Sequence, residues 1–364
     1  MTYALAAAGT GGHVYPALAV AEALEDAGVE KSSILFFGGG RFEKAAVPAA
    51  GYAFIELDLR GLKRSFSAAN LSLPLVVARA ARRVQGVVQA RGVQVLLATG
   101  GYVTVPAGWG SRRAGIPFFV QEQNAHAGLA NRIMSRWAEA AFTSFEQTAG
   151  IDNAIFLGNP LRREFTTFDR SNQRPAAFDY YGLSAGVPTL GVVGGSLGAG
   201  VLNEAVVDLV RSWTGGPLQI VHLAGRGHAR DLATGQAGSG ANPRGIVWRV
   251  VPFEDHMTMF FAAADLILAR SGGMVAEITA TGSPSILVPG GFGSKGHQDA
   301  SAGMLSRAGA AVVLPEPDIA GLPGMVQRLL ADPQRLAAMG LRAESVGRPA
   351  SASAIASRLV AAHG

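Results

Sequence analysis

The chain has 364 residues, more than one hydrophobic core usually supports, so two domains are expected. Hydrophobic residues make up 49% of the chain and charged residues 16%, which excludes disorder, and the lack of cysteine excludes disulfides and thiolate sites. The formal net charge of +5 favours anionic partners, but nucleic acid is not expected because no basic stripe is interleaved with aromatic residues.

Apolar runs that alternate with amphipathic stretches predict alternating strands and helices. In the first half, the expected strands are residues 3–8, 34–37, 93–98, 118–120 and 140–143. The first strand leads through a glycine-rich turn into a helix at residues 16–27, with Pro16 in its first turn, where a missing N–H costs nothing.

The second half repeats this arrangement. A strand is expected at residues 189–193, a glycine-rich turn at 194–200 and a helix at 201–210. We therefore predict the α/β class, with two tandem Rossmann-like domains. The predicted divisions are residues 1–160, residues 161–345 and a C-terminal helix at 346–364 that packs on the first domain.

No apolar run reaches the roughly 18–20 residues of a membrane-spanning helix. The N-terminus also lacks the basic region of a signal peptide. From these two features we expect a soluble chain.

The first glycine-rich turn, Gly9-Thr10-Gly11-Gly12-His13, lies between an expected strand and an expected helix. Glycines there let backbone N–H groups face an anion at the helix N-terminus. His13 either caps the helix or acts as a general base beside that anion, and the turn alone does not decide between these roles.

Two further turns follow strands of the same expected sheet. Thr99-Gly100-Gly101-Tyr102 offers a second phosphate-compatible turn, or an ordinary tight connection. Gln121-Glu122-Gln123-Asn124 places four polar residues at the end of a buried strand, where either ligand groups or loop backbone must satisfy them. Ligands of open α/β sheets bind at the edge formed by the carboxyl ends of the strands, where these turns are expected.

The second half has comparable features. Gly194-Gly195-Ser196 puts backbone donors and a hydroxyl at a helix start. Arg270 follows an expected strand, and Glu277 in the next helix could accept the hydroxyls of a ribose or lie on a solvated surface. His297-Gln298-Asp299 follows a glycine-rich loop at residues 290–296 that we expect to close over a ligand.

Together these residues resemble the MurG family of N-acetylglucosaminyltransferases. Members convert undecaprenyl-pyrophosphoryl-MurNAc-pentapeptide (lipid I) to lipid II in bacterial peptidoglycan synthesis, and so serve cell-wall biogenesis, cell shape and division. The resemblance runs from about Leu5 to Val313 and is specific in the order and spacing of its motifs. These are the turns at residues 9–13, 99–102 and 194–196, Glu122-Gln123-Asn124 with Ala127-Gly128-Leu129, Gly158-Asn159-Pro160, and Arg270-Ser271-Gly272 with Glu277.

The resemblance implies a GT-B architecture, two Rossmann-like domains facing across a cleft, and inverting transfer from UDP-GlcNAc to the 4-hydroxyl of MurNAc. It implies His13 as catalytic base, with Glu122 as an alternative or orienting group. No metal or cofactor is expected. The implied partners are UDP-GlcNAc and the undecaprenyl-linked acceptor at the cytoplasmic face of the cell membrane; the oligomeric state stays open.

Binding residues are implied by the same positions. Those for the donor are Thr10, Gly11, Gly12, Asn124, Arg162, Ser196, Arg270, Glu277 and Gln298. Those for the acceptor are Gly12, His13, Gly100, Gly101 and Tyr102.

Some positions depart from the family pattern. Leu197 stands where Gln is usual, Gln121 where His is usual, and Ser301 where Asn is usual. The turn between Arg270 and Glu277 is one residue short, with Met274-Val275 where Thr is common, and the loop pair is His297-Gln298 in place of two Gln. These changes bear mainly on how the uracil and GlcNAc of the donor are held.

A basic set around the apolar residues 71–77 is compatible with an anionic membrane surface or with a solvated helix face. Its members are Arg60, Lys63, Arg64, Arg79, Arg82 and Arg83.

Three other functions stay open. An enzyme of the same fold, such as a UDP-GlcNAc 2-epimerase or a lipid glycosyltransferase, would share the glycine-rich turns. A nicotinamide-dependent oxidoreductase should show Gly-x-Gly-x-x-Gly and an acidic residue about 20 positions on, for which Glu25 and Glu30 are poor candidates. A non-catalytic UDP-sugar-binding protein would keep the donor site alone.

Overall fold

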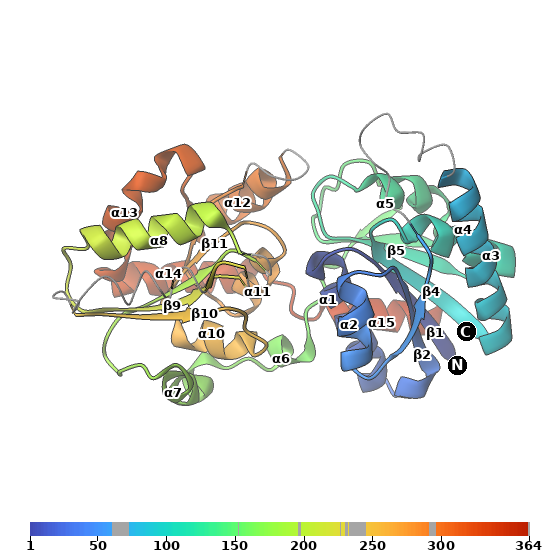
Figure 1. Ribbon diagram of the computed structural model, residues 1–364, viewed down its shortest axis with the longest axis horizontal. Helices are drawn as coiled ribbons and strands as arrows, with labels where there is room; N and C mark the ends of the chain where they lie inside the picture. The colour runs from blue at the N-terminus through green and yellow to red at the C-terminus, as the bar shows by residue number, and fades with distance from the viewer. Residues whose placement is uncertain are drawn as a thin grey trace. The chain divides into compact units, whose positions relative to one another are not determined.

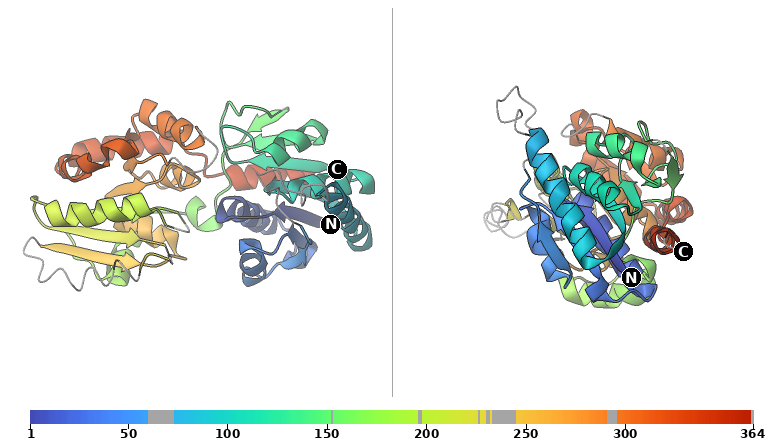
Figure 2. Two further views of the ribbon diagram at one scale, coloured as in Figure 1. Left: turned by 45° about the horizontal axis from the view of Figure 1, so that its top comes forward. Right: turned by 90° about the vertical axis from the view of Figure 1, so that its right-hand side faces the viewer.

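The computed structural model describes residues 1–59, 73–151, 153–195, 198–225, 227–229, 232, 245–290 and 296–362. The chain forms two compact units, one of Met1–Thr166 with Arg348–Gly364 and one of Thr167–Gly347 (Figures 1 and 2). The first unit thus extends past residue 160 to Thr166, and the chain returns to this unit at Arg348. Each unit is a parallel sheet with helices packed on it, which confirms the expected class of two tandem Rossmann-like domains.

The first unit alternates strands and helices along the chain. Its elements are β1 (Thr2–Ala7), α1 (Gly11–Asp26), β2 (Ile34–Gly38), α2 (Phe42–Ala49), β3 (Ala53–Glu56), α3 (Leu73–Arg91), β4 (Val93–Gly100), α4 (Thr104–Ala114), β5 (Phe118–Glu122), α5 (Leu129–Met134), β6 (Ala140–Thr143), β7 (Ala154–Phe156), α6 (Arg163–Thr166) and α15 (Ser351–Ala361). The strand order is β3-β2-β1-β4-β5-β6-β7, so the order reverses at β1, where ligands of such sheets bind.

Strand β1 shows how the core of the first unit is divided. Alternate residues of a strand point to opposite faces of the sheet. Tyr3 and Leu5 pack in a cluster with residues of α1 and α15, whereas Ala4 and Ala6 pack in a cluster with residues of α3 and α4. The C-terminal helix α15 therefore completes one helical layer of the first unit, as its contact with α1 also shows (Figure 1).

The second unit repeats the arrangement. Its elements are α7 (Arg170–Tyr181), β8 (Thr189–Val193), α8 (Gly200–Ser212), β9 (Leu218–Leu223), β10 (Ile246–Val251), α10 (Met257–Ala263), β11 (Leu266–Ala269), α11 (Met274–Ala280), β12 (Ser285–Leu287), α12 (His297–Arg307), β13 (Ala311–Val313), α13 (Leu322–Leu330) and α14 (Pro333–Val346). The strand order is β10-β9-β8-β11-β12-β13, and one helical layer is built from α8, α13 and α14. Among the described residues, no helix is both long and apolar enough to cross a membrane.

The start of α1 differs from the prediction. The helix begins at Gly11, not at Pro16, so Pro16 lies inside it. The prediction was wrong because Gly11 and Gly12 were assigned to the turn, although the amides of an anion-binding turn can already have helical orientation. Proline has no backbone N–H, so Pro16 cannot donate to the Gly12 carbonyl. Gly12 is exposed, and water can solvate that carbonyl instead.

Two strands also extend further than predicted. Strand β4 includes Thr99 and Gly100, and β5 includes Gln121 and Glu122, which were expected to follow the strand. The prediction ended each strand at the first polar residue. Strand pairing uses backbone hydrogen bonds, however, and these continue whether the side chain is polar or apolar. The polar side chains therefore begin on the sheet itself, which holds them more rigidly than a loop would.

His222 on β9 is a buried imidazole in the second unit. Its Nε2 lies 3.0 Å from Asn203 Oδ1, and its ring stacks on Trp248. The Asn203 amide nitrogen donates to the carbonyl of Ala224, so Asn203 Oδ1 is an acceptor and His222 Nε2 carries the proton. Desolvation lowers the pKa of His222 to about 4, so this histidine is neutral at pH 7.

This depressed pKa predicts acid sensitivity. Between pH 6.5 and about 4 the unfolded chain binds more protons than the folded one, so the free energy of unfolding falls as the pH falls through this window. The shift corresponds to about 3 kcal/mol. We expect His222→Gln, which keeps a donor toward Asn203, to lose about 3 kcal/mol less than the native chain between pH 7 and pH 4 in urea unfolding. An identical pH dependence of the two chains would contradict this account.

Candidate active site

The candidate site of the first unit lies where neighbouring strands end. In the sheet, β2, β1, β4 and β5 are consecutive neighbours, so the loops after them meet at one edge. The sequence-predicted turns at residues 9–13, 99–102 and 121–124 all lie at this edge. The described part of the second unit places Arg270 and Glu277 at the corresponding edge of its own sheet.

His13 sits in the first turn of α1 and is held through one ring nitrogen. Its Nδ1 lies 3.2 Å from the Thr99 carbonyl oxygen and 3.0 Å from Gln123 Oε1. A carbonyl only accepts hydrogen bonds, so Nδ1 must carry the proton in the neutral imidazole. This tautomer leaves Nε2 with its lone pair, and His13 has the form that a general base requires.

Two glycines allow this contact. Gly100 and Gly101 have φ of +117° and +83°, in the region that side chains rarely adopt. A Cβ on Gly100 would lie 2.5 Å from His13 Nδ1, and one on Gly101 would lie 2.3 Å from the carbonyl oxygen of Ala8. The β1 and β4 turns can therefore touch only because both positions are glycine.

Gln123 completes the support of His13. Its amide nitrogen donates to the Thr99 carbonyl and to Gln121 Oε1, while its oxygen faces His13. The sequence marked Gln123 only as one of a polar run. The useful signal was the spacing of Gln121 and Gln123, since residues two apart share one face of a strand.

Glu122 is buried and fully occupied. It is 1% exposed, and its carboxylate accepts hydrogen bonds from Asn124 N, Asn124 Nδ2, Gly128 N and Asn131 Nδ2 at 2.9–3.0 Å. Four donors use the acceptor capacity of a carboxylate. The geometry therefore favours Glu122 as the group that orients Asn124 and its loop over Glu122 as a base.

Tyr102 and Arg162 each contact partners within the first unit. The Tyr102 hydroxyl lies beside Glu43, and burial together with the charge of Glu43 raises the pKa of Tyr102. Arg162 pairs with Glu164 at 2.5 Å and lies over the ring of Tyr15 on α1. Backbone N–H groups, rather than the Tyr102 hydroxyl, are thus what the β4 turn presents.

In the second unit, Gln298 joins two loops. Gly290 N donates to Gln298 Oε1 at 2.7 Å, and Ser271 Oγ donates to the Gln298 carbonyl at 2.8 Å. Arg270 lies beside the same loop, donating to the Val288 carbonyl and pairing with Glu316 at 2.5 Å.

Glu277 is half-buried in the first turn of α11, where the helix amides favour a carboxylate. Ser196 and residues 291–295 of the expected closing loop lie outside the described residues.

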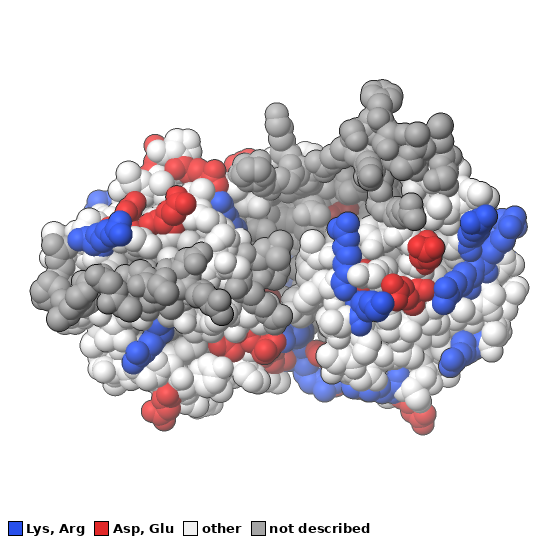
Figure 3. Space-filling view, in the orientation of Figure 1, with Lys and Arg blue, Asp and Glu red and all other residues white. Residues whose placement is uncertain are grey.

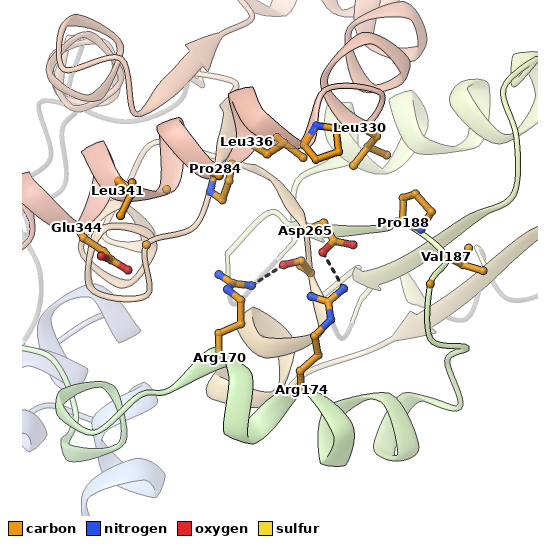
Figure 4. Close-up of a pocket in the computed structure, with 16 residues that line it drawn as sticks. Arg170, Arg174, Val187, Pro188, Asp265, Pro284, Leu330, Leu336, Leu341 and Glu344 are labelled. Atoms are coloured by element: carbon orange, nitrogen blue, oxygen red, sulfur yellow. Dashed lines mark hydrogen bonds and ion pairs between the residues drawn. The ribbon is translucent and has the colours of Figure 1, made fainter.

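A hollow of about 650 Å³ lies at the opposite, amino-terminal edge of the second sheet (Figure 4). Arg170 is half-buried there and donates to the carbonyls of Phe261, Ala264 and Thr281, and desolvation lowers the pKa of its guanidinium to about 10. Arg174 pairs with Asp265 at 2.7 Å. These cations are used to hold helix ends and strand starts together, so the hollow is not a site for an anionic sugar nucleotide.

Within the described residues, no group of three or more His, Asp or Glu side chains is arranged to hold a metal ion.

Comparison with known proteins identifies the family. Residues 3–143 match the glycosyltransferase family 28 N-terminal domain, and residues 189–355 match the glycosyltransferase family 28 C-terminal domain. A Halorhodospira halophila protein named UDP-N-acetylglucosamine--N-acetylmuramyl-(pentapeptide) pyrophosphoryl-undecaprenol N-acetylglucosamine transferase is 38% identical over 355 residues, covering 96% of this chain and 94% of its own. A protein of the same name from Acidothermus cellulolyticus is 37% identical over 358 residues, with the same coverage of both chains. This chain belongs to the MurG family.

The structure comparison agrees with this assignment. The crystal structure of Acinetobacter baumannii MurG matches with a TM-score of 0.76 and 25% identity, covering 99% of this chain and 100% of that one. The protein is therefore a glycosyltransferase of GT-B architecture, as the motifs predicted, and the oxidoreductase reading is wrong. Glycine-rich turns occur in both enzyme classes because both bind phosphate groups, so the turns do not indicate nicotinamide chemistry.

Two residues of the site were not singled out from the sequence. Glu43 on α2 is fully buried and contacts the turns after β1 and β2, and Asn203 on α8 links that helix to the carbonyl after β9. Each lies in a helix whose pattern resembles an ordinary amphipathic one, so only burial distinguishes it. A single acidic residue close behind three glycines, as Glu43 is behind Gly38-Gly39-Gly40, was the available signal.

The position of Glu122 gives a prediction about stability and rate. Glu122→Ala leaves two backbone amides and two Asn side chains without their acceptor, and each unsatisfied buried donor costs about 1–3 kcal/mol. We expect Glu122→Ala to lower the free energy of unfolding by about 3 kcal/mol or more, with a smaller loss for Glu122→Gln. A Glu122→Gln enzyme that keeps the pH–rate profile of the native one supports orientation; loss of the acidic limb would instead identify Glu122 as the base.

Proposed function

We propose that this glycosyltransferase transfers GlcNAc from UDP-GlcNAc to the 4-hydroxyl of MurNAc in undecaprenyl-pyrophosphoryl-MurNAc-pentapeptide, with inversion, converting lipid I to lipid II. The names of the relatives at 37–38% identity support the substrates. The observation that carries the mechanism is His13, whose protonated Nδ1 is held by the Thr99 carbonyl and whose Nε2 is left as a proton acceptor at the start of α1.

The proposed step is one displacement. The acceptor O4 forms a bond to the anomeric carbon as the bond from that carbon to the UDP oxygen breaks, and His13 Nε2 takes the hydroxyl proton. Attack opposite the leaving group gives the β-linkage. Negative charge grows on the departing diphosphate, and we propose that helix N-terminal amides with Arg162 stabilise it without an obligatory metal or cofactor.

The donor is proposed to bind chiefly through the second unit. Glu277 accepts from the ribose hydroxyls, and Gln298 uses its amide nitrogen for the GlcNAc, since its oxygen already binds Gly290 N. Arg270 and Ser196 act near the nucleotide phosphates. From the first unit, Asn124 is aimed by Glu122, and the turn at residues 10–12 adds backbone donors.

The acceptor diphosphate is proposed to bind backbone amides of the first unit. The leading N–H groups of a helix lack intrahelical partners, and Gly11 and Gly12 supply them at α1. Gly100, Gly101 and the backbone of Tyr102 form the neighbouring turn. In this proposal the diphosphate binds beside His13, and the acceptor hydroxyl approaches Nε2.

The first test follows labelled GlcNAc from UDP-GlcNAc to a lipid I analogue. We expect His13→Ala to lower kcat by about 10²–10⁴-fold, the usual contribution of a general base, with the Kd for UDP-GlcNAc unchanged. Steady-state transfer kinetics and calorimetric donor binding measure both quantities.

The outcomes separate the alternatives. Transfer that survives in His13→Ala keeps the reaction and removes His13 as base. Turnover of UDP-GlcNAc without acceptor indicates an epimerase, and tight donor binding without any transfer by the native chain indicates a binding protein or a different acceptor.

A basic and apolar surface on α3 and α4 is proposed to rest on the cytoplasmic face of the cell membrane. The side chains of Leu75 and Trp109 are 54% and 41% exposed. Exposed arginines on the same two helices are Arg79, Arg82, Arg83, Arg112 and Arg113. Figure 3 shows Lys and Arg side chains gathered at the edge of the first unit where α3 and α4 lie in Figure 1. Arg60, Lys63 and Arg64, predicted to belong to this surface, lie outside the described residues.

This proposal predicts vesicle binding that depends on charge. Each basic residue near an anionic surface contributes about 1 kcal/mol, so replacing Arg79, Arg82 and Arg83 by Gln should weaken binding to vesicles with anionic lipid by roughly 100-fold. Replacing Arg328 and Arg335 of the second unit by Gln is the control and should change binding little. Vesicle co-sedimentation measures both, and equal effects of the two sets would contradict the assignment of this surface.

A further inference from the structure

Glu43 is a buried carboxylate at the edge of the first sheet, outside the groups that act on the substrates. It lies in the first turn of α2 and is 0% exposed. Its Oε2 accepts from Gly9 N at 3.0 Å, and its Oε1 accepts from Gly39 N at 2.9 Å. The Tyr102 hydroxyl lies beside the same carboxylate, and burial together with the charge of Glu43 raises the pKa of Tyr102.

These three groups come from three different loops. Gly9 belongs to the turn after β1, Gly39 to the turn after β2, and Tyr102 to the turn after β4. One carboxylate therefore joins the turns after β1 and β2 by hydrogen bonds and lies beside Tyr102 of the turn after β4. The N-terminal end of α2 adds favourable helix amides, which explains how a charged group is tolerated in this buried position.

We propose that Glu43 is a positioning residue for the acceptor, one that sets the turns after β1 and β4 in the arrangement that receives the acceptor diphosphate. This inference rests on the proposed transfer to a diphosphate-linked acceptor. The proposed role is indirect. Glu43 holds Gly9, which precedes the amides of Gly11 and Gly12, and it lies beside Tyr102, whose turn contacts His13 through Gly100. Preformed turns bind the diphosphate without first being ordered.

The chemistry requires a carboxylate at this position. Two N–H groups donate to it and one O–H lies beside it, and a carboxylate has two oxygens with only acceptor sites. A glutamine of the same size has one acceptor oxygen and presents its NH₂ to a backbone N–H. Glu43→Gln therefore keeps the packing and removes the hydrogen-bond pattern, so it separates positioning from simple filling of the core.

The neighbourhood supplies a matched control. Glu56 ends β3 beside the same loops, but its carboxylate is 43% exposed and pairs with Lys44 at 2.9 Å. Glu56→Gln removes a surface ion pair, which usually contributes little. It makes the same chemical change as Glu43→Gln but leaves the hydrogen bonds of Glu43 to Gly9 and Gly39 in place.

The experiment measures transfer kinetics of the whole enzyme with UDP-GlcNAc and a lipid I analogue. We expect Glu43→Gln to raise the KM for the acceptor by on the order of 10–100-fold while the KM for UDP-GlcNAc stays within a factor of about two, because misplaced binding groups weaken only the ligand that they hold. Glu56→Gln should leave both values unchanged. An unchanged acceptor KM in a folded Glu43→Gln enzyme, or equal rises in both KM values, would overturn the inference.

Tyr102→Phe tests the same link from the other side. If the hydroxyl acts through Glu43, its removal raises the acceptor KM in the native background and has no further effect in Glu43→Gln. A full additional effect in the double variant would mean that the hydroxyl meets the acceptor directly, and would overturn its role through Glu43. Should Glu43→Gln fail to fold, Tyr102→Phe decides alone: an unchanged acceptor KM rejects the inference.

Amide hydrogen exchange gives a readout that needs no acceptor. We expect faster exchange in the segments that contain Gly9 and Gly39 in Glu43→Gln, and native exchange there in Glu56→Gln. Lack of transfer by the native enzyme would reject the proposed function, whereas native transfer with unaltered exchange and acceptor KM in Glu43→Gln would reject only this inference.

Discussion

The contact between His13 Nδ1 and the Thr99 carbonyl is the interaction on which the site depends. It joins the helix after β1 to the end of β4, and it is possible only because Gly100 has no side chain where the imidazole lies. The same contact fixes the tautomer, since a backbone carbonyl can only accept a proton. This hydrogen bond joins the turns after β1 and β4. It also leaves Nε2 of His13 unprotonated, so the proposed phosphate binding and the proposed proton transfer depend on the same contact.

The first unit uses buried carboxylates as structural acceptors close to a site for anionic ligands. Glu43 accepts hydrogen bonds from the turns after β1 and β2, and Glu122 accepts four from Asn124, Gly128 and Asn131. In both cases the negative charge is taken up by amide groups behind the site. The amides at the start of α1 lie beside these held loops and are the groups that we propose for the diphosphate.

The second unit repeats the sheet order of the first but uses its polar groups differently. Gln298 and Arg270 tie the loops after β11 and β12 together at the carboxyl edge. Arg170 is half-buried at the amino-terminal edge and His222 is buried near the end of β9, and desolvation lowers the pKa of each. Their roles are to satisfy helix carbonyls and an amide oxygen. The two units thus share topology, whereas their titratable groups serve separate purposes.

The sequence by itself determined the fold class and most of the candidate site, because glycine-rich turns between a buried strand and a helix are local features with a fixed spacing. It placed His13, Gly100, Gly101 and Asn124 in loops that the strand order then brought to one edge. It did not determine that α1 starts at Gly11, that Glu122 is saturated by donors, or that Tyr102 turns toward Glu43. Those facts depend on partners far apart in the chain, and hydrogen-bond donors from separate loops converge only after the parallel strands have paired. Tertiary structure therefore decided which polar side chains hold the loops in place.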